Sequence, residues 1–203
     1  MLDQVSNRKL VAAGLGDDLR DKAARLISAT YLLNYGAAIK SFPKTLIALA
    51  DDRQRVHAAA GLRDFSEPYF SEYYLDAPIE AILTAVSRKP IDRGKIVEVS
   101  SLASRTPAIS VQFMKAVISY GEGLGYDWAF FTATGRLERL LRRMHLPLID
   151  LGPADSRRVP SPELWGSYYE TEPRVLAFGR EQLTPFLVSK RAPAKTAELC
   201  LHG

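Results

Sequence analysis

The chain has 203 residues, of which 47% are hydrophobic and 25% charged, the composition of an ordinary globular protein with room for one well-buried domain. Its net charge of +4 and pI near 9.2 fall short of the basic stripe of a dedicated nucleic-acid-binding domain, but they suit an anionic small-molecule partner. One cysteine, Cys200, excludes a disulfide framework, and the three histidines lack metal-ligand spacing, so we expect no metal cofactor.

The N-terminus lacks the basic segment and apolar core of a secretory signal, and no run of about 18 apolar residues indicates a membrane-spanning helix. We therefore expect a cytoplasmic protein without a transmembrane segment. Residues 1–16 are expected to form a flexible leader and residues 181–203 a polar, basic tail. Residues 17–180 then form a single domain.

The first predicted elements are a helix and a hairpin. Asp17 and Asp18 suit the start of a helix, and apolar residues at helical spacing continue to about Leu33. Short apolar runs over residues 44–50 and 56–62 flank a polar turn, which is the pattern of a β-hairpin.

An aromatic cluster follows, with Tyr69, Phe70, Tyr73 and Tyr74 close together. Such a cluster either walls a ligand pocket or forms a small core under a long loop. Asp76 lies where a short helix begins, so it is placed to cap that helix.

The most informative stretch covers residues 95–110, where a buried strand ends in a polar loop that opens a helix. Ile96, Val97 and Val99 make a nearly continuous apolar run, which Glu98 interrupts. A buried carboxylate is costly unless it is paired or its pKa rises, so Glu98 is a candidate functional group. The alternatives are that this face of the strand is open to water, or that a neighbouring arginine pairs with Glu98.

Strands and helices alternate in the rest of the chain. We expect a helix after Thr106, a strand at 127–134, a helix at 135–145, and strands at 146–151 and 174–178. The 135–145 helix has leucines on one face and arginines on the other, which favours a solvated arginine surface. These arginines are Arg136, Arg139, Arg142 and Arg143.

This order of elements predicts an α/β fold with a mixed central β-sheet flanked by helices on both faces. It is similar to the GNAT acyltransferase fold, in which the fourth strand and the next helix bind the pyrophosphate of acyl-CoA. The GNAT loop pattern Q/R-x-x-G-x-G/A is matched in part by residues 105–110, Arg-Thr-Pro-Ala-Ile-Ser. Arg105 fits the pattern, whereas Ala108 and Ser110 depart from it and Pro107 removes a backbone donor from the anion site.

Four motifs stand out in combination. They are Tyr74-Leu-Asp-Ala-Pro-Ile-Glu80, Ile96-Val-Glu-Val-Ser-Ser-Leu-Ala103, Phe131-Thr-Ala-Thr134 and Trp165-Gly-Ser-Tyr-Tyr-Glu-Thr-Glu-Pro-Arg-Val175. Together they resemble the thermostable haemolysin family, a GNAT-like group with distant similarity to acyl-homoserine-lactone synthases, which make autoinducers.

The similarity to the GNAT fold implies an acyltransferase that moves an acyl group from an acyl-CoA or acyl-carrier-protein thioester to the amine of a small molecule. Glu98 would take the proton of the amine. Many GNAT enzymes carry a tyrosine acid after the fifth strand, but Leu141 stands there, so Tyr168 or Tyr169 is the candidate acid. The thioester is expected to bind at Val99, Ser100, Ser101, Ser104, Arg105, Thr106 and Ala108. The acceptor is expected to contact Tyr73, Tyr74, Asp76, Thr132 and Trp165.

Two other functions stay open. The family name suggests a membrane-active haemolysin without catalysis, or lysis through an amphiphilic product. The third interpretation is a non-catalytic binding module, or a protein that binds nucleic acid through its bulk charge. We favour the acyltransferase, whose partners would be a small-molecule amine and an acyl donor, either acyl-CoA or an acyl-carrier protein, without specific nucleic acid.

Overall fold

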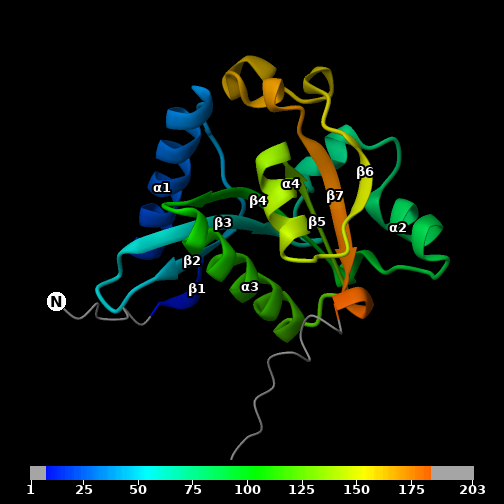
Figure 1. Cartoon of the computed structure of the whole chain (residues 1–203), viewed down its shortest axis with the longest axis horizontal. Coiled ribbons are helices and arrows are strands. Elements are labelled where there is room, and N and C mark those ends of the chain that lie inside the picture. The colour runs from blue at the N-terminus through cyan, green and yellow to red at the C-terminus, as the bar shows by residue number, and fades with distance from the viewer. Residues whose placement is uncertain (1–7, 184–203) are drawn as a thin grey trace, which may run out of the picture.

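One mixed β-sheet forms the centre of the molecule (Figure 1). The computed structural model describes residues 8–183, and within them seven strands follow the order β1-β2-β3-β4-β5-β7-β6. Their bounds are β1 Lys9–Ala13, β2 Thr45–Ala50, β3 Val56–Arg63, β4 Ile96–Ser104, β5 Trp128–Ala133, β6 Ile149–Pro153 and β7 Arg174–Gly179. Of the neighbouring strands in this sheet, β4 and β5 run parallel and the others antiparallel.

Helices cover both faces of this sheet, as the sequence predicts. Their bounds are α1 Asp18–Tyr35, α2 Ile79–Ser87, α3 Pro107–Gly123 and α4 Gly135–Arg143. The largest core cluster joins α3 and α4 to one face, on the viewer's side of the sheet in Figure 1. On the other face, α1 packs on the N-terminal strands, while α2 and the short helix η1 (Phe70–Tyr74) pack on the C-terminal strands.

The N-terminal helix and hairpin form as predicted. The Asp17 side chain accepts a hydrogen bond from Leu19 N–H at the start of α1, and Gly36 ends the helix with a left-handed φ of 65°. β2 and β3 pair antiparallel, and their apolar residues are buried. The strand predicted at 146–151 lies at Ile149–Pro153.

The predicted leader and tail are too long. Lys9–Ala13 form strand β1, because the apolar strand β2 offers them an open edge and Ala13 is fully buried there. At the other end, Arg180–Leu183 form a short helix in which Leu183 packs into the core. Residues 1–7 and 184–203, which hold the rest of the two predictions, lie outside the described part of the chain.

Strands β4 and β5 separate after a short parallel ladder. The ladder joins Ile96, Val97 and Glu98 to residues 128–130. Beyond it, β4 stays paired with β3 but contains one extra residue, because Ala59 pairs with Ala103 whereas Gly61 pairs with Ser100. Ser101 lies in this bulge with φ 51°, a left-handed conformation that is uncommon outside glycine. The bulge lies just beyond Glu98, where the ladder with β5 ends.

Candidate active site

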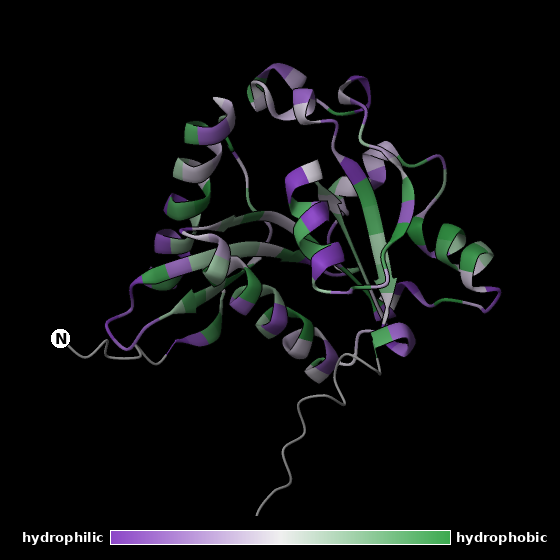
Figure 2. Ribbon diagram, viewed as in Figure 1, coloured by the Kyte–Doolittle hydropathy of each residue, from purple (hydrophilic) through white to green (hydrophobic). Residues whose placement is uncertain are grey.

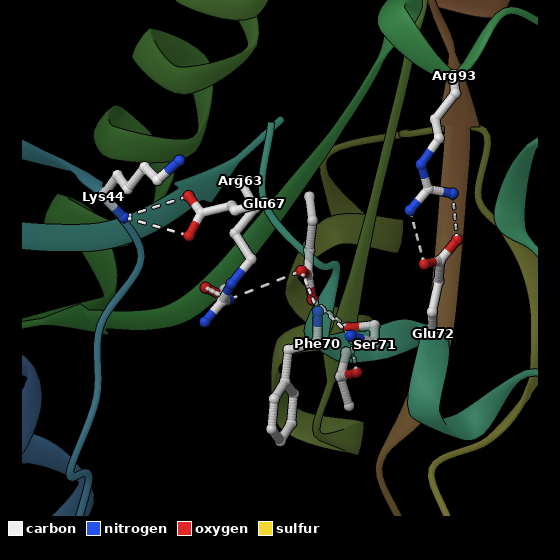
Figure 3. Close-up of polar contacts among 10 residues, drawn as sticks. Lys44, Arg63, Glu67, Phe70, Ser71, Glu72 and Arg93 are labelled. Carbon is white, nitrogen blue, oxygen red and sulfur yellow. Dashed lines mark hydrogen bonds and ion pairs between the residues drawn. The ribbon is translucent and has the colours of Figure 1, made fainter. Parts of the chain in front are cut away.

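Glu98 is fully buried, and its carboxylate is held by a set of nearby donors. The backbone N–H of Phe70 donates to Oε2, and the backbone N–H and hydroxyl of Ser71 donate to Oε1, each at 2.7 Å. Arg63 Nη1 lies 3.7 Å from Oε2. In Figure 3, Arg63 and Ser71 approach from opposite sides. The Glu98 side chain is therefore not exposed to water, and an arginine lies beside it, which is the second of the two alternatives.

The surroundings of Glu98 act on its pKa in opposite directions. Burial raises the pKa, while Arg63 and the donors from Ser71 and Phe70 lower it; the balance leaves the pKa raised. A carboxylate with a raised pKa is a better base than an exposed one, because its conjugate acid holds a proton more firmly.

The register of three neighbouring strands places the polar side chains together. Arg63 on β3 is the direct partner of Glu98 on β4, and Glu98 is the partner of Phe130 on β5. Side chains alternate along a strand, so Thr132 shares a face with Phe130 and hence with Glu98. Arg63 also donates to Ser100 Oγ at 3.0 Å.

A chain of hydroxyl groups leads from Glu98 to Thr132. Ser71 Oγ lies 2.8 Å from Thr132 Oγ1 and donates to Glu98 Oε1. A serine hydroxyl has one proton, so while Glu98 is ionised Thr132 must donate to Ser71. The order of donors is therefore Thr132, then Ser71, then Glu98.

The helix η1, which supplies three of the donors to Glu98, is fixed by an ion-pair network. Arg93 binds both carboxylate oxygens of Glu72, at 2.6 and 2.8 Å (Figure 3). It also binds Glu80 Oε2 at 2.7 Å. Its guanidinium also lies 4.4 Å from the ring centre of Tyr69. Burial alone would raise the pKa of Glu72, but Arg93 and the N–H of Ile79 bring it below its usual value. Glu72 is thus ionised and joins η1 to the start of α2.

Two cavities meet beside the hydroxyl chain. The larger, the cleft cavity of about 640 Å³, lies where β4 and β5 have separated. The smaller, the Glu98 pocket of about 240 Å³, includes Glu98, Arg63 and Ser71 in its wall. The residues that line both are Tyr31, Ser101, Thr132 and Tyr168. A molecule in each cavity would therefore meet at Thr132.

Three arginines line the cleft cavity: Arg105, Arg136 and Arg143. The prediction of a solvated arginine surface on α4 is thus correct only in part, because two of the four arginines line the cavity. The purple bands on α4 in Figure 2 mark its hydrophilic residues. Arg105 is anchored through its Nε to Val56 O at 3.0 Å. The start of α3 adds few donors, since Pro107 has no N–H and Ile109 N–H bonds to Thr106 Oγ1.

An apolar pocket of about 50 Å³ adjoins the cleft cavity. The two share Val99, Met114 and Phe131 in their walls. The apolar pocket continues between β4, β5 and α3 towards Trp128 and Phe178. It offers an apolar group in the cleft cavity a way into the core.

The two candidate tyrosines occupy different positions. Tyr168 is buried and lines both cavities, and burial raises its pKa well above its usual 10. Tyr169 lies outside both walls, and its hydroxyl is 2.8 Å from that of Tyr74. Tyr168 is therefore the tyrosine that can reach a bound molecule.

Most of the predicted site residues line one of the cavities. In the cleft cavity these are Val99, Ser101, Ser104, Arg105 and Thr106; in the Glu98 pocket they are Tyr74, Glu98, Ser100, Thr132 and Trp165. Tyr73, Asp76, Ala108 and Tyr169 are absent from these walls.

Asp76 does not cap a helix, contrary to the prediction. Its exposed carboxylate binds Arg158 Nη1 at 2.7 Å. The first N–H of α2, that of Ile79, donates instead to Glu72 Oε1 at 3.0 Å. The side chain that caps α2 is therefore Glu72 of η1. Arg93 holds it beside this helix, because Arg93 binds both Glu72 and Glu80.

Arg63, Ser71 and Lys40 line the Glu98 pocket but are not predicted from the sequence. The position of Ser71 could have drawn attention in the sequence, because it is a small polar residue inside the aromatic cluster. Arg63 ends its strand on the face opposite Leu62, which becomes informative only when the register with β4 is known.

The sequence matches the family model described as "Thermostable hemolysin" over residues 14–183. No curated protein sequence matches the chain. Among the helices of the described residues, none is long and apolar enough to cross a membrane. Within the same residues, no cluster of His, Cys, Asp and Glu side chains is placed to hold a metal ion.

Solved structures of low sequence identity share the fold. The acyl-homoserine-lactone synthase BjaI, solved with SAM and isopentyl-CoA, is 15% identical with a TM-score of 0.60 and covers 92% of this chain and 91% of its own. FeeM, an N-acyl amino acid synthase from uncultured soil microbes, is 18% identical with a TM-score of 0.57 and coverage of 89% and 98%. The AHL synthase LasI is 11% identical with a TM-score of 0.56 and coverage of 86% and 90%. The fold is thus the GNAT-like α/β fold that the element order predicts.

Proposed function

The chain belongs to the thermostable haemolysin family. We propose that it is an acyltransferase, which moves an acyl group from a thioester to the amine of a small molecule. The observation that carries this proposal is the position of Glu98. Its carboxylate connects through Ser71 to Thr132, at the place where two cavities meet. An acyl transfer between two substrates needs a base at such a junction. The structural relatives BjaI and FeeM, by their names, are acyl-transferring synthases.

The cleft cavity suits the acyl donor. Arg105, Arg136 and Arg143 would neutralise the phosphates of CoA or of the pantetheine arm of a carrier protein. The apolar pocket would take the acyl chain, whose carbonyl would then lie near Thr132. Beyond Glu98, β4 has no ladder with β5 in the described chain, so backbone N–H groups on that edge can donate to the carbonyl oxygen.

The amine would occupy the Glu98 pocket and attack the thioester carbon. As the N–C bond forms, the amine passes a proton to Thr132, Thr132 to Ser71, and Ser71 to Glu98. The C–S bond then breaks, and the sulfur leaves as a thiolate that takes a proton from water to become the free thiol. Glu98 returns its proton to water, which restores the base. Tyr168 keeps its proton at neutral pH because burial raises its pKa, so it can donate a hydrogen bond to that sulfur.

Release of free thiol from the donor tests the proposal. The purified full chain is mixed with acyl-CoA donors of graded chain length and a panel of small amines, and the thiol is measured with and without the amine. We expect release that depends on the amine, an N-acyl product by mass spectrometry, and a loss of about 100-fold or more in Glu98→Gln. Glu170→Gln, an exposed residue away from both cavities, is the matched control and should keep the rate of the wild type.

Equal thiol release by the wild type and Glu98→Gln would contradict the proposal. The same holds if no donor, whether CoA or carrier-protein thioester, yields an amide. Dye release from liposomes distinguishes the alternative function: leakage that Glu98→Gln retains, without any acyl transfer, would favour direct membrane activity.

A further inference from the structure

The Glu98 pocket has more positive charge than its one carboxylate can balance. Arg63 and Lys40 line it, and Glu98 is the single acidic residue among the described residues of its wall. Within residues 8–183, no hydrogen bond or ion pair engages the Lys40 ammonium. A ligand in this pocket would therefore meet a net positive charge.

Arg63 has donors that the protein does not use. Its Nη1 serves both Ser100 and Glu98, at 3.0 and 3.7 Å. In the described part of the chain, Nε and Nη2 of Arg63 make no hydrogen bond. Neither atom is fully buried, so both keep some access to solvent. These donors are therefore not fully enclosed by protein, and Arg63 is part of the pocket wall, although only 14% of its side chain is exposed. A guanidinium edge of this kind matches a carboxylate.

The rest of the wall combines hydroxyl-bearing side chains with apolar ones, and the space is small. Phe70, Leu164 and Trp165 contribute to it, and the ring of Phe70 lies 6.0 Å from the Arg63 guanidinium. The volume of about 240 Å³ is below the roughly 300–1,000 Å³ of pockets for drug-sized ligands. Such a pocket suits a compact molecule with one anionic end and an apolar side.

We infer that the Glu98 pocket binds a free α-amino acid with an apolar or aromatic side chain, whose carboxylate is held by Arg63 with Lys40 at the rim. Because Arg63 and Thr132 stand on strands either side of Glu98, the carboxylate at Arg63 leaves the amino group beside Thr132. The inference rests on the proposed function for the fate of that amino group, which would be acylated. Binding itself needs no acyl donor.

Calorimetric titration without a donor tests the inference. The full chain is titrated with leucine, methionine, phenylalanine and tryptophan, and with the four primary amines that lack only the carboxylate. We expect at least one amino acid to bind about 10-fold or more tightly than its amine, the fold-change of a charge-assisted hydrogen bond. Arg63→Gln should abolish this ratio, and Lys40→Gln should reduce it in part. Arg53→Gln, an exposed arginine in the turn between β2 and β3, is the matched control and should keep it.

Arg63→Lys covers the case in which Arg63→Gln fails to fold, as judged from its thermal midpoint. Lysine keeps the charge but loses the two-pronged guanidinium, so the ratio should fall while the chain stays folded. The inference is overturned if no amino acid binds more tightly than its amine, or if folded Arg63→Gln or Arg63→Lys keeps the ratio. Tight binding of an amino acid without any thiol release would support this site and refute the proposed function. Acyl transfer to amines, with no preference for amino acids in binding, would support the proposed function and refute this site.

Discussion

The hydroxyls of Ser71 and Thr132 lie 2.8 Å apart, although 61 positions separate the two residues along the chain. One belongs to the short helix η1 and the other to a central strand. Their contact places a proton path between a buried carboxylate and a cavity wall, and each group on that path can be removed separately.

Thr132→Val removes the outer hydroxyl and keeps the shape of the side chain. Because the amine then has no group to receive its proton, we expect kcat for acyl transfer to fall by about 100-fold. Thr132→Ser restores a hydroxyl and should stay within about 10-fold of the wild type. Steady-state thiol release measures both variants, and a Thr132→Val enzyme with the kcat of the wild type would show that the proton takes another route.

The rate should depend on pH through Glu98. The base works when ionised, and its pKa is raised above the usual 4.5, so activity is lost as the pH falls through this higher pKa. Ser71→Ala deletes a hydrogen bond that lowers the pKa, and the acidic limb should therefore move to higher pH. A profile of kcat/KM between about pH 5 and 8 tests this. A limb that moves to lower pH in Ser71→Ala would contradict the assignment of the base.

Arg93→Met should destabilise the protein by removing the clamp on η1. Glu72 and Glu80 would then face each other without a counter-ion, and we expect a loss of about 1–2 kcal/mol in the free energy of unfolding, since the network is partly exposed. Arg142→Met, which breaks the exposed pair with Glu138, is the control, with an expected loss of about 0.5 kcal/mol or less. Urea unfolding measures both, and equal losses would mean that the clamp adds nothing.

Gly61→Ala should disturb the strand beside the site. A Cβ atom there would lie 2.4 Å from Pro43 Cγ and 2.7 Å from Ser100 Oγ, so one neighbour must move. We expect a loss of about 1–3 kcal/mol in the free energy of unfolding. Gly121→Ala, at a position in α3 with no atom within 4 Å of the added Cβ, should instead stabilise the helix by about 0.5–1 kcal/mol. A neutral Gly61→Ala variant would show that Pro43 yields freely.

Local patterns in the sequence suffice for much of the fold and for Glu98. The caps at Asp17 and Thr106 and the apolar run around Glu98 are short-range features, and the structure confirms the elements that they predict. Strand β1 was missed because Lys9–Ala13 are mostly exposed at the sheet edge and show little alternation. An edge strand of this kind depends on its neighbour more than on its own sequence.

The surroundings of Glu98 could not be predicted in the same way. Ser71 reaches it across 27 positions, and Arg63 reaches it through the register of two strands. Neither relationship has a period in the sequence. The choice between Tyr168 and Tyr169 depends likewise on the short helix that begins at Tyr168. Neighbouring side chains on a helix point in different directions, so Tyr168 lines the cavities while Tyr169 contacts Tyr74.

The short parallel ladder between β4 and β5 joins two antiparallel halves, one from β1 to β4 and the other from β5 to β6. Three residue pairs make that seam, so little backbone bonding links the halves past Glu98. A substrate in the cleft cavity would contact both halves of the sheet, because residues of β4 and of β5 line that cavity. It would therefore add contacts between the two halves. Amide hydrogen exchange near the open end of the cleft should then slow in both halves when the donor binds. Binding of the donor would thus stabilise the sheet as a whole.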